Sequence, residues 1–469
     1  MGSGVEYRER MSDSDALLWN NERDPMLRST IASVLLLDRA PDEGRFREAL
    51  DRALERIPRL RQCVVLDPFA VAPPRWGLAP HFDLAYHVRR IGAPGKGSLR
   101  ELLDLAAPIA MQAFDKDRPL WEFTLVEGIE QGRHALIMKL HHSVSDGVGL
   151  VRMTSSLVER TREPDPSRQG RPRSVGEEAE GSPERGPFEE ALEALRYRAG
   201  ADMARTSRIA RAVRHGLLGV ARDPLGALRT AAGLAGSIGR TLRPVSEPMS
   251  PLMTGRSLAV RFDAFARPLA DLRRAAKAVG GTLNDAFVAA VAGGLRLYHE
   301  RRGHPVAELR MTMPINLREG EHGRDAGNQF APARFAVPIG IEDPAERMRA
   351  IRVCVAAARS EPALPISEEI AGVLGRLPRV LAVPLFGSML KAIDFVTSNV
   401  PGPPFPVYVG GARVEQMFGF GPLSGAAVNA TLFSYDGELQ FGINTDPAAV
   451  SDPELFVECL ERGVAEVLS

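Results

Sequence analysis

Stretches of apolar and polar residues alternate along the chain in a pattern typical of an α/β protein. Residues 31–37 form a continuous apolar run, which predicts a buried strand. From Phe46 to Ile57, apolar residues then recur at helical spacing, which predicts an amphipathic helix. Helix and strand therefore alternate from the start, as in folds whose helices pack on sheets.

The pattern becomes more specific after residue 98. "SLRELLDLA" opens with the Ser98 and Glu101 pair of a capping box, which predicts the start of a helix. "LWEFTLVE" and "HALIMKL" predict two strands joined by the turn-rich "GIEQGR". The second strand leads directly into "LHHSVSDGVG", residues 140–149, which holds two adjacent histidines.

The composition changes abruptly between residues 162 and 187. Pro, Gly, Ser and charged residues replace apolar ones there, which predicts a disordered linker. Apolar residues then return every three to four positions from Leu192 to Val220, which predicts an amphipathic helix. Arginines crowd the stretch 196–243, and two interpretations stay open for it: a solvated helical face, or a face that attracts anionic lipid headgroups.

A second α/β part follows from Ser257. Three segments predict helices: "GGTLNDAFVAAVAGGLRLYHE", "DPAERMRAIRVCVAAA" with Asp343 as cap and Pro344 at its first position, and "DPELFVECLERGVAEVL". Four segments predict strands: "LRMTMPINL", "DFVTSNV", "AAVNATLFSY" and "LQFGINT". The chain thus divides into an N-terminal half (1–160), a polar and basic crossover (161–250) and a C-terminal half (251–469).

Length and composition limit the classes of protein further. A chain of 469 residues exceeds what one hydrophobic core usually supports, which favours two domains. The 59 basic and 59 acidic residues cancel, so net charge gives no reason to expect a nucleic-acid partner. Cys63, Cys354 and Cys459 lie far apart in sequence and lack metal-binding spacing, which suits small buried residues in a reducing compartment.

Targeting and membrane signals are weak. The N-terminus has no apolar core of a secretory signal, so none is predicted. No apolar run approaches the roughly 18 residues of a membrane-spanning helix, and "VLAVPLFGSMLKAIDFV" is interrupted by proline and charges. Any membrane contact is therefore predicted to be peripheral.

The double histidine has a structural and a chemical interpretation. Adjacent residues of a strand point to opposite faces, so only one of His141 and His142 faces a given site. In the structural interpretation, both pack and Asp146 caps the helix that follows. In the chemical one, a neutral imidazole accepts a proton, Asp146 fixes the loop and Gly147 permits a tight turn. No GxSxG segment occurs, so the substrate would supply the nucleophile, and a metal site is disfavoured because no third ligand cluster exists.

The segment from His141 to Gly147 matches HHxxxDG and resembles the active-site motif of the CoA-dependent acyltransferase superfamily, which includes chloramphenicol acetyltransferase and peptide-synthetase condensation domains. Further segments are similar, in the same order, to bacterial wax ester synthase/diacylglycerol acyltransferases. They are "MSDSDALLWNNERDPM", "FDLAYHVRR", "DKDRPLWEFTLVEG", "GTLNDAF", "MPINLRE", "GNQF", "TSNVPGP" and "SYDGELQFGINTD". The resemblance spans nearly the whole chain.

The resemblance implies a two-domain α/β fold of the chloramphenicol acetyltransferase type, with mixed sheets and an active-site tunnel between the halves. It implies transfer of a long-chain acyl group from acyl-CoA, as co-substrate and with no further cofactor, to the hydroxyl group of diacylglycerol or a fatty alcohol. The expected location is cytoplasmic, at the inner membrane face or on lipid droplets, and the oligomeric state stays open. Two alternatives remain: an acyltransferase for another alcohol, and a catalytically silent lipid-binding protein.

The resemblance also implies roles for individual residues. His142 would be the general base, His141 a supporting neighbour, and Asp146 a residue that orients the loop. Gly147 would leave room at the tunnel, and Asn284 would hydrogen-bond near the reacting acyl group or the oxyanion, where one donor is worth roughly 3 kcal/mol.

Three further elements are expected to support the site. Asp285 is expected to cap and brace its helix. Pro119, Leu120 and Trp121 match a family element that either packs at a strand entry or contacts the acyl chain. Ser398 and Asn399 match a segment that crosses between the halves. "SVS" within the histidine motif and "MPINLRE" depart from the usual family sequence and leave the acceptor preference open.

Overall fold

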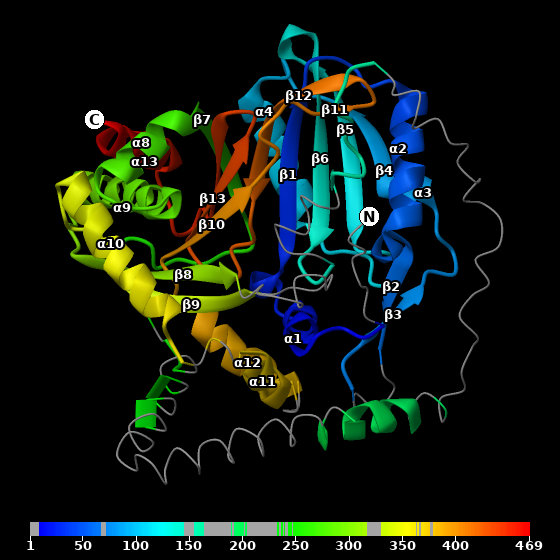
Figure 1. The fold of residues 1–469 in the computed structure, drawn as a ribbon, viewed down its shortest axis with the longest axis horizontal. Helices are drawn as coiled ribbons and strands as arrows, with labels where there is room; N and C mark the ends of the chain where they lie inside the picture. The colour runs from blue at the N-terminus through cyan, green and yellow to red at the C-terminus, as the bar shows by residue number, and fades with distance from the viewer. Residues whose placement is uncertain are drawn as a thin grey trace.

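The computed structural model describes residues 9–66, 72–144, 154–163, 247–316 and 330–469, apart from 363, 365–366 and 376–378, together with short parts of the segment 189–245. Within these residues, two six-stranded sheets stand side by side with helices on their outer faces (Figure 1). A ribbon of β2 (Gln62–Val65) and β3 (Arg75–Leu78) lies in the N-terminal half. The predicted α/β architecture of two halves is confirmed.

The N-terminal sheet has the strand order β11-β12-β1-β6-β5-β4. Its strands are β1 (Thr30–Leu37), β4 (Val88–Gly92), β5 (Trp121–Ile129), β6 (Arg133–His141), β11 (Tyr408–Val409) and β12 (Ala412–Phe420). All neighbours are antiparallel except β4 and β5, which are parallel. The sheet is therefore mixed, as predicted.

Strand β1 reads as a continuous apolar run because both of its faces are covered. Ile31, Leu35 and Leu37 pack into a core that includes α2 (Glu43–Arg56), on one side of the sheet. The alternate residues Ala32, Val34 and Leu36 pack into a second core under α4 (Leu99–Met111). The predicted capping box of Ser98 and Glu101 begins α4, and its hydrogen bonds are present in both directions.

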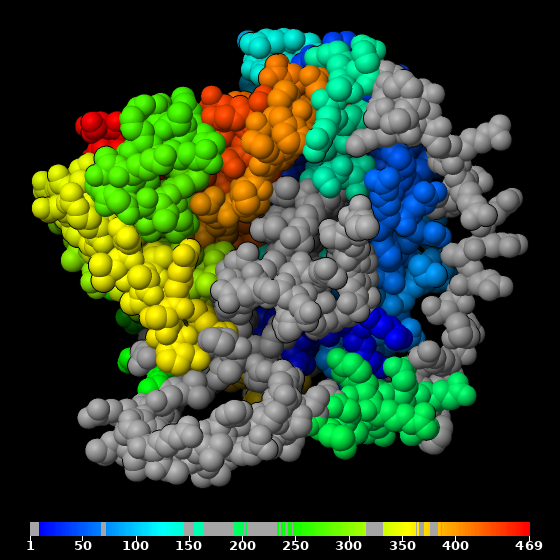
Figure 2. Space-filling view, viewed as in Figure 1, coloured from blue at the N-terminus to red at the C-terminus, as the bar shows by residue number. Residues whose placement is uncertain are grey.

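Two strands of this sheet come from the C-terminal half. β12 pairs with β1 in antiparallel register from Ala32 opposite Phe420 to Leu37 opposite Val414. Residues 154–163, which follow the histidine motif, add a bridge between Glu159 and Tyr408 of β11. Figure 2 shows this teal segment packed beside the orange one that carries β11 and β12. The segment predicted as the C-terminal half thus completes the sheet of the N-terminal half.

The C-terminal sheet has the strand order β7-β14-β13-β10-β8-β9. Its strands are β7 (Arg261–Pro268), β8 (Glu308–Asn316), β9 (Phe330–Pro338), β10 (Phe395–Pro401), β13 (Val428–Tyr435) and β14 (Glu438–Thr445). Helices α8 (Leu269–Ala278), α9 (Leu283–Arg301), α10 (Pro344–Arg359) and α13 (Pro453–Leu468) lie on the side away from the N-terminal sheet (Figure 1). Asp343 caps α10 and Pro344 occupies its first turn, as predicted.

Helices α9 and α13 cross at a contact between their backbones. A Cβ atom added to Gly463 of α13 would lie 2.3 Å from the backbone nitrogen of Gly294 in α9. Only glycines allow so close a crossing. The other side of α9 packs on the apolar face of the C-terminal sheet.

Three further helices, α1 (Asp13–Asn21), α11 (Ser367–Leu374) and α12 (Arg379–Leu390), lie below the sheets in Figure 1. α3 (Leu84–His87) lies beside α2 and contacts β4 and β5, and 3-10 turns occur at Pro25–Leu27, Pro58–Arg61 and Glu130–Gly132. α1 packs against α11 and α12, which joins the beginning of the N-terminal half to the C-terminal half. In the described residues, no single helix has the length and apolar character to cross a membrane, and the bent pair α8 and α9 meets those criteria only jointly.

Several predictions fall outside the described residues. The linker 162–187 is described only to residue 163, and most of the basic stretch 196–243 is likewise outside. Within the predicted amphipathic helix 192–220, residues 192–200 are helical.

Candidate functional site

The two histidines stand where β6 ends against the beginning of β1. His141 is the last residue of β6 and pairs with Thr30 of β1. The backbone N–H of His142 donates to the carbonyl of Ser29 at 2.7 Å, and the chain then turns through residues 142–144. His141 is 1% exposed, whereas His142 is partly exposed. The end of the strand therefore separates a buried histidine from one that solvent reaches.

Both ring nitrogens of His141 are buried beside polar groups. The backbone N–H of Ser143 lies 3.1 Å from Nδ1 and can only donate, so Nδ1 is an acceptor and the ring proton belongs on Nε2. The Ser143 hydroxyl also lies 2.7 Å from Nδ1. Nε2 lies 3.2 Å from Oε1 of Glu22, an ion-pair distance, but the two atoms lack the geometry of a hydrogen bond. The burial of the His141 ring, at 1% exposure, keeps it away from a substrate proton.

Aromatic rings hold the His141 imidazole edge-on. The Trp19 ring lies 5.7 Å and the Phe114 ring 6.1 Å from it, centroid to centroid, both nearly perpendicular. Phe114 in turn faces the ammonium of Lys139, which is fully buried and lies 3.5 Å from Glu122. Burial lowers the pKa of Lys139 although Glu122 opposes that shift.

Glu22 is a site residue that the sequence did not single out. It follows α1 directly as its C-cap, inside "LLWNNERDPM", and its side chain is 5% exposed. Burial alone raises the pKa of its carboxyl, but the hydrogen bond and charge of His141, together with the Ser29 N–H, lower that pKa below its ordinary value. Nothing in the spacing of the sequence indicates that this carboxylate meets a strand end more than a hundred residues later.

Two predicted site residues, Asp146 and Gly147, lie outside the described residues. Their roles in orienting the loop and leaving room at a tunnel stay predictions.

Pro119, Leu120 and Trp121 lie beside the histidines where the neighbouring strand β5 begins. The carbonyl of Leu120 accepts the backbone N–H of His141 at 3.0 Å. Trp121 is fully buried, its Nε1 donates to the carbonyl of Leu60 at 2.8 Å, and its ring stacks on His87 at 4.5 Å. The described contacts of Trp121 are thus packing contacts within the N-terminal half.

Asn284 and Asp285 lie in the first turn of α9. Asp285 forms a capping box with Thr282: its carboxylate accepts the backbone N–H of Thr282 at 2.8 Å. Nδ2 of Asn284 lies 3.6 Å from Sδ of Met313 in β8. Met313 belongs to the core between α9 and the C-terminal sheet. The described contact of Asn284 therefore lies between α9 and that sheet, on the side away from the N-terminal sheet.

Ser398 and Asn399 are consecutive residues of β10, and their side chains alternate across the sheet. Ser398 pairs with Thr431 of β13 and is half-buried, whereas Asn399 is exposed. The neighbouring Val400 packs against the core of the N-terminal half, so this strand meets both halves.

A cavity of about 70 Å³ lies between the halves. Arg28, Thr30 and Met111 line it from the N-terminal half. Arg256, Leu258 and Asn444 are among its lining residues from the C-terminal half. Thr30 pairs with His141, so the cavity borders the strand end that carries the histidines.

The Arg256 guanidinium beside this cavity is bound by carbonyl groups of Met253, Gly255, Ile393 and Gly425. Burial lowers the pKa of Arg256 against the opposing charges of Asp446 and Asp394. Among the residues that the structure describes, no group of three or more His, Cys, Asp or Glu side chains could hold a metal ion.

Comparison with protein families matches both halves of the chain. Residues 11–287 match the wax ester synthase/diacylglycerol acyltransferase catalytic domain, and residues 326–467 match the C-terminal domain of the same family. A Mycobacterium tuberculosis protein provisionally named a diacylglycerol O-acyltransferase is 38% identical over all of this chain and 93% of its own length. A second such protein from that organism is 31% identical over 86% of this chain and 84% of its own.

Solved structures share the fold. A wax ester synthase/diacylglycerol acyltransferase from Marinobacter aquaeolei superposes with a TM-score of 0.63 at 22% identity, covering 98% of both chains. The first condensation domain of a calcium-dependent antibiotic synthetase gives 0.61 at 19% identity, covering 100% of this chain and 96% of that one. A starter condensation domain of rhizomide synthetase, solved with C8-CoA and Leu-SNAC, gives 0.57 at 13% identity, covering 98% and 93%.

Proposed function

This chain belongs to the wax ester synthase/diacylglycerol acyltransferase family, and on that premise we propose that it transfers a long-chain acyl group from acyl-CoA to the hydroxyl group of diacylglycerol, a fatty alcohol or both. Acyl transfer is the reaction class of the family. The acyl donor, the acceptor and the general base are the parts of the proposal that experiment must test.

His142 is the general base in this proposal. Its neutral imidazole takes the proton of the acceptor hydroxyl while the oxygen attacks the thioester carbonyl carbon. The tetrahedral intermediate then collapses, the carbon–sulfur bond breaks, and the imidazolium returns the proton to the CoA thiolate. The products are an ester and free CoA, and no enzyme nucleophile is needed.

One observation supports His142 above all others. Of the two adjacent histidines, His141 is buried, with its ring in contact with Ser143 and Glu22, whereas His142 is partly exposed beyond the strand end. A base that meets two substrates must be reachable, and only His142 of the pair fulfils that condition.

The long-chain acceptor in this proposal follows from family membership and from physical chemistry. Each methylene of a lipid chain buried against apolar side chains contributes about 0.8 kcal/mol, so an apolar tunnel binds a long-chain alcohol more tightly than a short one. The cavity of about 70 Å³ between the halves is smaller than such a chain, and its lining mixes apolar side chains such as Met111, Leu258 and Val260 with polar ones such as Asn444.

The acceptor is tested with purified protein, radiolabelled palmitoyl-CoA and a panel of alcohols. Dioleoylglycerol and hexadecanol are compared with ethanol and with a sterol, and both CoA release and labelled ester are measured. We expect ester formation with one or both lipid alcohols. Exclusive use of the sterol or of ethanol contradicts the proposal and favours an acyltransferase for another alcohol.

The base is tested by His142→Ala. Loss of a general base lowers kcat by about 10²- to 10⁴-fold while the thermal unfolding midpoint stays close to that of the unchanged protein. Equal turnover in both proteins contradicts the assignment of His142. Absence of turnover in the unchanged protein with every acceptor favours the catalytically silent lipid-binding alternative.

Peripheral binding to a lipid surface, at the inner membrane face or on lipid droplets, is the second part of the proposal. The helical residues 192–200 and 202–203 carry large apolar side chains in contact with solvent, Leu195 at 54% and Met203 at 75% exposure. Exposed apolar residues among arginines are typical of helices that lie on anionic membranes.

Sedimentation with phosphatidylglycerol vesicles tests this surface. We expect the double variant Leu195→Glu and Met203→Glu to lose most of its binding. Val353→Glu is the matched control, because Val353 is 69% exposed on α10, far along the chain from this helix. Equal loss in both variants contradicts a membrane contact through residues 192–203.

A further inference from the structure

Glu22, Ser29, His141 and His142 form a closed circuit of contacts where β1 begins and β6 ends. Oε1 of Glu22 accepts the backbone N–H of Ser29 at 2.8 Å. The carbonyl of Ser29 accepts the backbone N–H of His142 at 2.7 Å. The same Oε1 lies 3.2 Å from Nε2 of His141. Oε1 of Glu22 therefore contacts Ser29, whose carbonyl accepts the backbone N–H of His142, and also the ring of His141, which directly precedes His142.

The circuit extends to the residue that follows His142. Nδ1 of His141 accepts the backbone N–H of Ser143 at 3.1 Å, and the backbone N–H of Val144 donates to the carbonyl of His141 at 3.0 Å. His142 thus follows His141, whose ring contacts Glu22. It precedes Ser143, whose backbone N–H donates to that same ring. A shift of the His141 ring would move the turn that carries His142.

The burial of Glu22 needs an explanation, because a buried carboxylate is costly unless it is paired and hydrogen-bonded. Its side chain is 5% exposed, and its partners are the Ser29 N–H and the His141 ring. Lys116 adds only a more distant charge, and its ammonium is occupied over the Trp19 ring at 4.8 Å. The partners that stabilise this carboxylate are therefore those that hold the histidine turn.

We propose that Glu22 is a positioning residue for acyl transfer: its carboxylate orients the His141 ring and the start of β1, and through them sets where His142 presents its imidazole. This inference rests on the proposed function of His142 as general base. Glu22 touches no reacting atom and acts only through its two neighbours. A displacement of about 1 Å at a reacting group can lower turnover about 100-fold, which is the size of effect expected when this oxygen is lost.

A double-mutant cycle tests the proposal in the full-length protein. Glu22→Leu removes the acceptor oxygen at similar volume, and we expect kcat to fall about 100-fold with KM for palmitoyl-CoA changed less than about threefold. In the His142→Ala background, the same substitution should leave the residual rate unchanged, because Glu22 then has no base to position. Glu22→Gln, whose amide oxygen can still accept the Ser29 N–H, should restore kcat to within about fivefold.

Two variants separate positioning from loss of folding. Asp394→Asn changes a fully buried carboxylate of the C-terminal half, which accepts the backbone N–H groups of Ser250 and Arg310, and should lower the unfolding midpoint without the loss of kcat. Glu22→Asp keeps the charge and withdraws it by one methylene, so it should fold and show an intermediate kcat even if Glu22→Leu does not fold.

The outcomes are distinguishable. A 100-fold loss for Glu22→Leu in both backgrounds, or no loss in either, overturns the positioning role and leaves the proposed function intact. A Glu22→Gln variant as slow as Glu22→Leu also overturns it. A His142→Ala protein with unchanged turnover overturns the proposed function itself, and the inference with it.

Discussion

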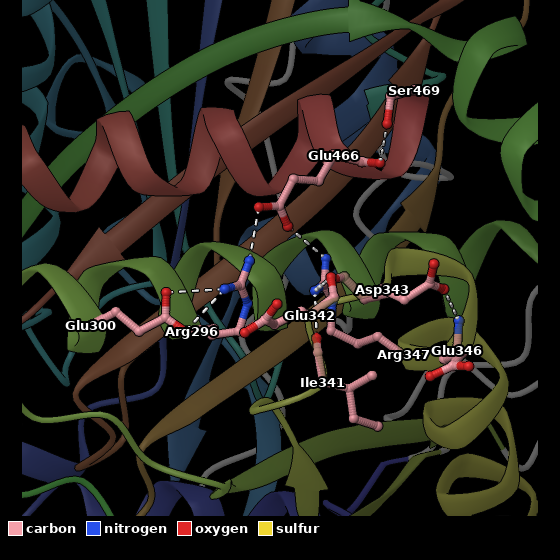
Figure 3. A network of polar contacts seen from close by, with 10 residues as sticks. Arg296, Glu300, Ile341, Glu342, Asp343, Glu346, Arg347, Glu466 and Ser469 are labelled. Carbon is pink, nitrogen blue, oxygen red and sulfur yellow. Dashed lines mark hydrogen bonds and ion pairs between the residues drawn. The ribbon is translucent and has the colours of Figure 1, made fainter.

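The buried guanidinium of Arg347 donates to the carboxylate of Glu466 at 3.0 Å and ties α10 to α13 on the outer side of the C-terminal sheet (Figure 3). The other carboxylate oxygen of Glu466 accepts from Arg296 of α9 at 2.8 Å. Arg347 also donates to carbonyl groups of Ala289, Ile341 and Glu342. The Glu466 carboxylate therefore joins α9, α10 and α13. Arg347 donates hydrogen bonds to the backbone carbonyl groups beside it in α9 and before α10.

Arg347→Ala is expected to lower the free energy of unfolding by about 3 kcal/mol. It leaves the buried carbonyl of Ala289 and the partly buried carbonyls of Ile341 and Glu342 without their donor and opens a cavity, while Glu466 keeps Arg296 as a partner and so limits the loss. Urea unfolding measures the change. Arg301→Ala is the matched control, since Arg301 also joins α9 to α13, through Glu458, but at an exposed pair worth about 0.5 kcal/mol. Similar losses in both variants would contradict the role of burial.

A buried histidine in the same half predicts a pH dependence of stability. His299 is fully buried, its Nδ1 bonds the carbonyl of Leu295 at 2.8 Å, and its Nε2 lies 2.7 Å from the Ser250 hydroxyl. Burial lowers the pKa of His299 below its ordinary value of 6.5, although the Leu295 bond and the charge of Asp394 act in the opposite direction. The unfolded chain therefore binds this proton at a higher pH than the folded one.

It follows that the contribution of His299 is fully present above pH 6.5 and declines as the pH falls below that value. We expect the free energy of unfolding to be lower at pH 5.5 than at pH 7.5, and the loss to be smaller in His299→Gln. Urea unfolding at both pH values gives the comparison, and His81→Gln, the same substitution at an exposed position, is the control. A loss of equal size in His299→Gln and the unchanged protein would show that another group is responsible.

Local patterns predicted most elements because each needs only neighbouring residues. The cap of α4 at Ser98, the cap of α10 at Asp343 and the apolar run of β1 all have the structure that the sequence predicts. The arrangement of β11 and β12 was not predicted, because the pairing of β12 with β1 depends on register between segments almost four hundred residues apart, and β11 joins the sheet only through β12. No periodicity carries that information.

The candidate site divides in the same way. The sequence located His141 and His142 at the end of a strand, and the strand and its end are as predicted. Glu22 was not predicted as a site residue because a lone acidic residue after a helix is common at protein surfaces. Only the fold shows that its side chain is buried against His141. The burial of Glu22, rather than its identity, distinguishes it.

Trp121 offers a test of packing against substrate contact. Trp121→Phe removes the hydrogen bond to Leu60 and part of the ring that stacks on His87, so we expect a loss of about 2 kcal/mol in the free energy of unfolding. Because the described contacts of Trp121 are internal, the preference among acyl-CoA chains of different length should not change. Competition between C12 and C18 acyl-CoA measures that preference, and an altered ratio with unchanged stability would assign Trp121 to the acyl site instead.

Because the C-terminal half supplies β11 and β12 to the N-terminal sheet, we predict that the N-terminal half cannot fold alone. In a fragment of residues 1–250, β1 would lose β12 along the whole register from Ala32 to Leu37 and expose the unpaired edge of an apolar strand. We expect this fragment to aggregate, and to become soluble when residues 251–469 are produced with it, since that chain supplies the missing strands. Size-exclusion chromatography and circular dichroism of the fragment, alone and with its complement, measure the difference. The control is a C-terminal fragment that lacks residues 408–420, which should not make the N-terminal fragment soluble. An N-terminal fragment that is folded and monodisperse on its own would contradict the prediction, because its sheet would then not need β12.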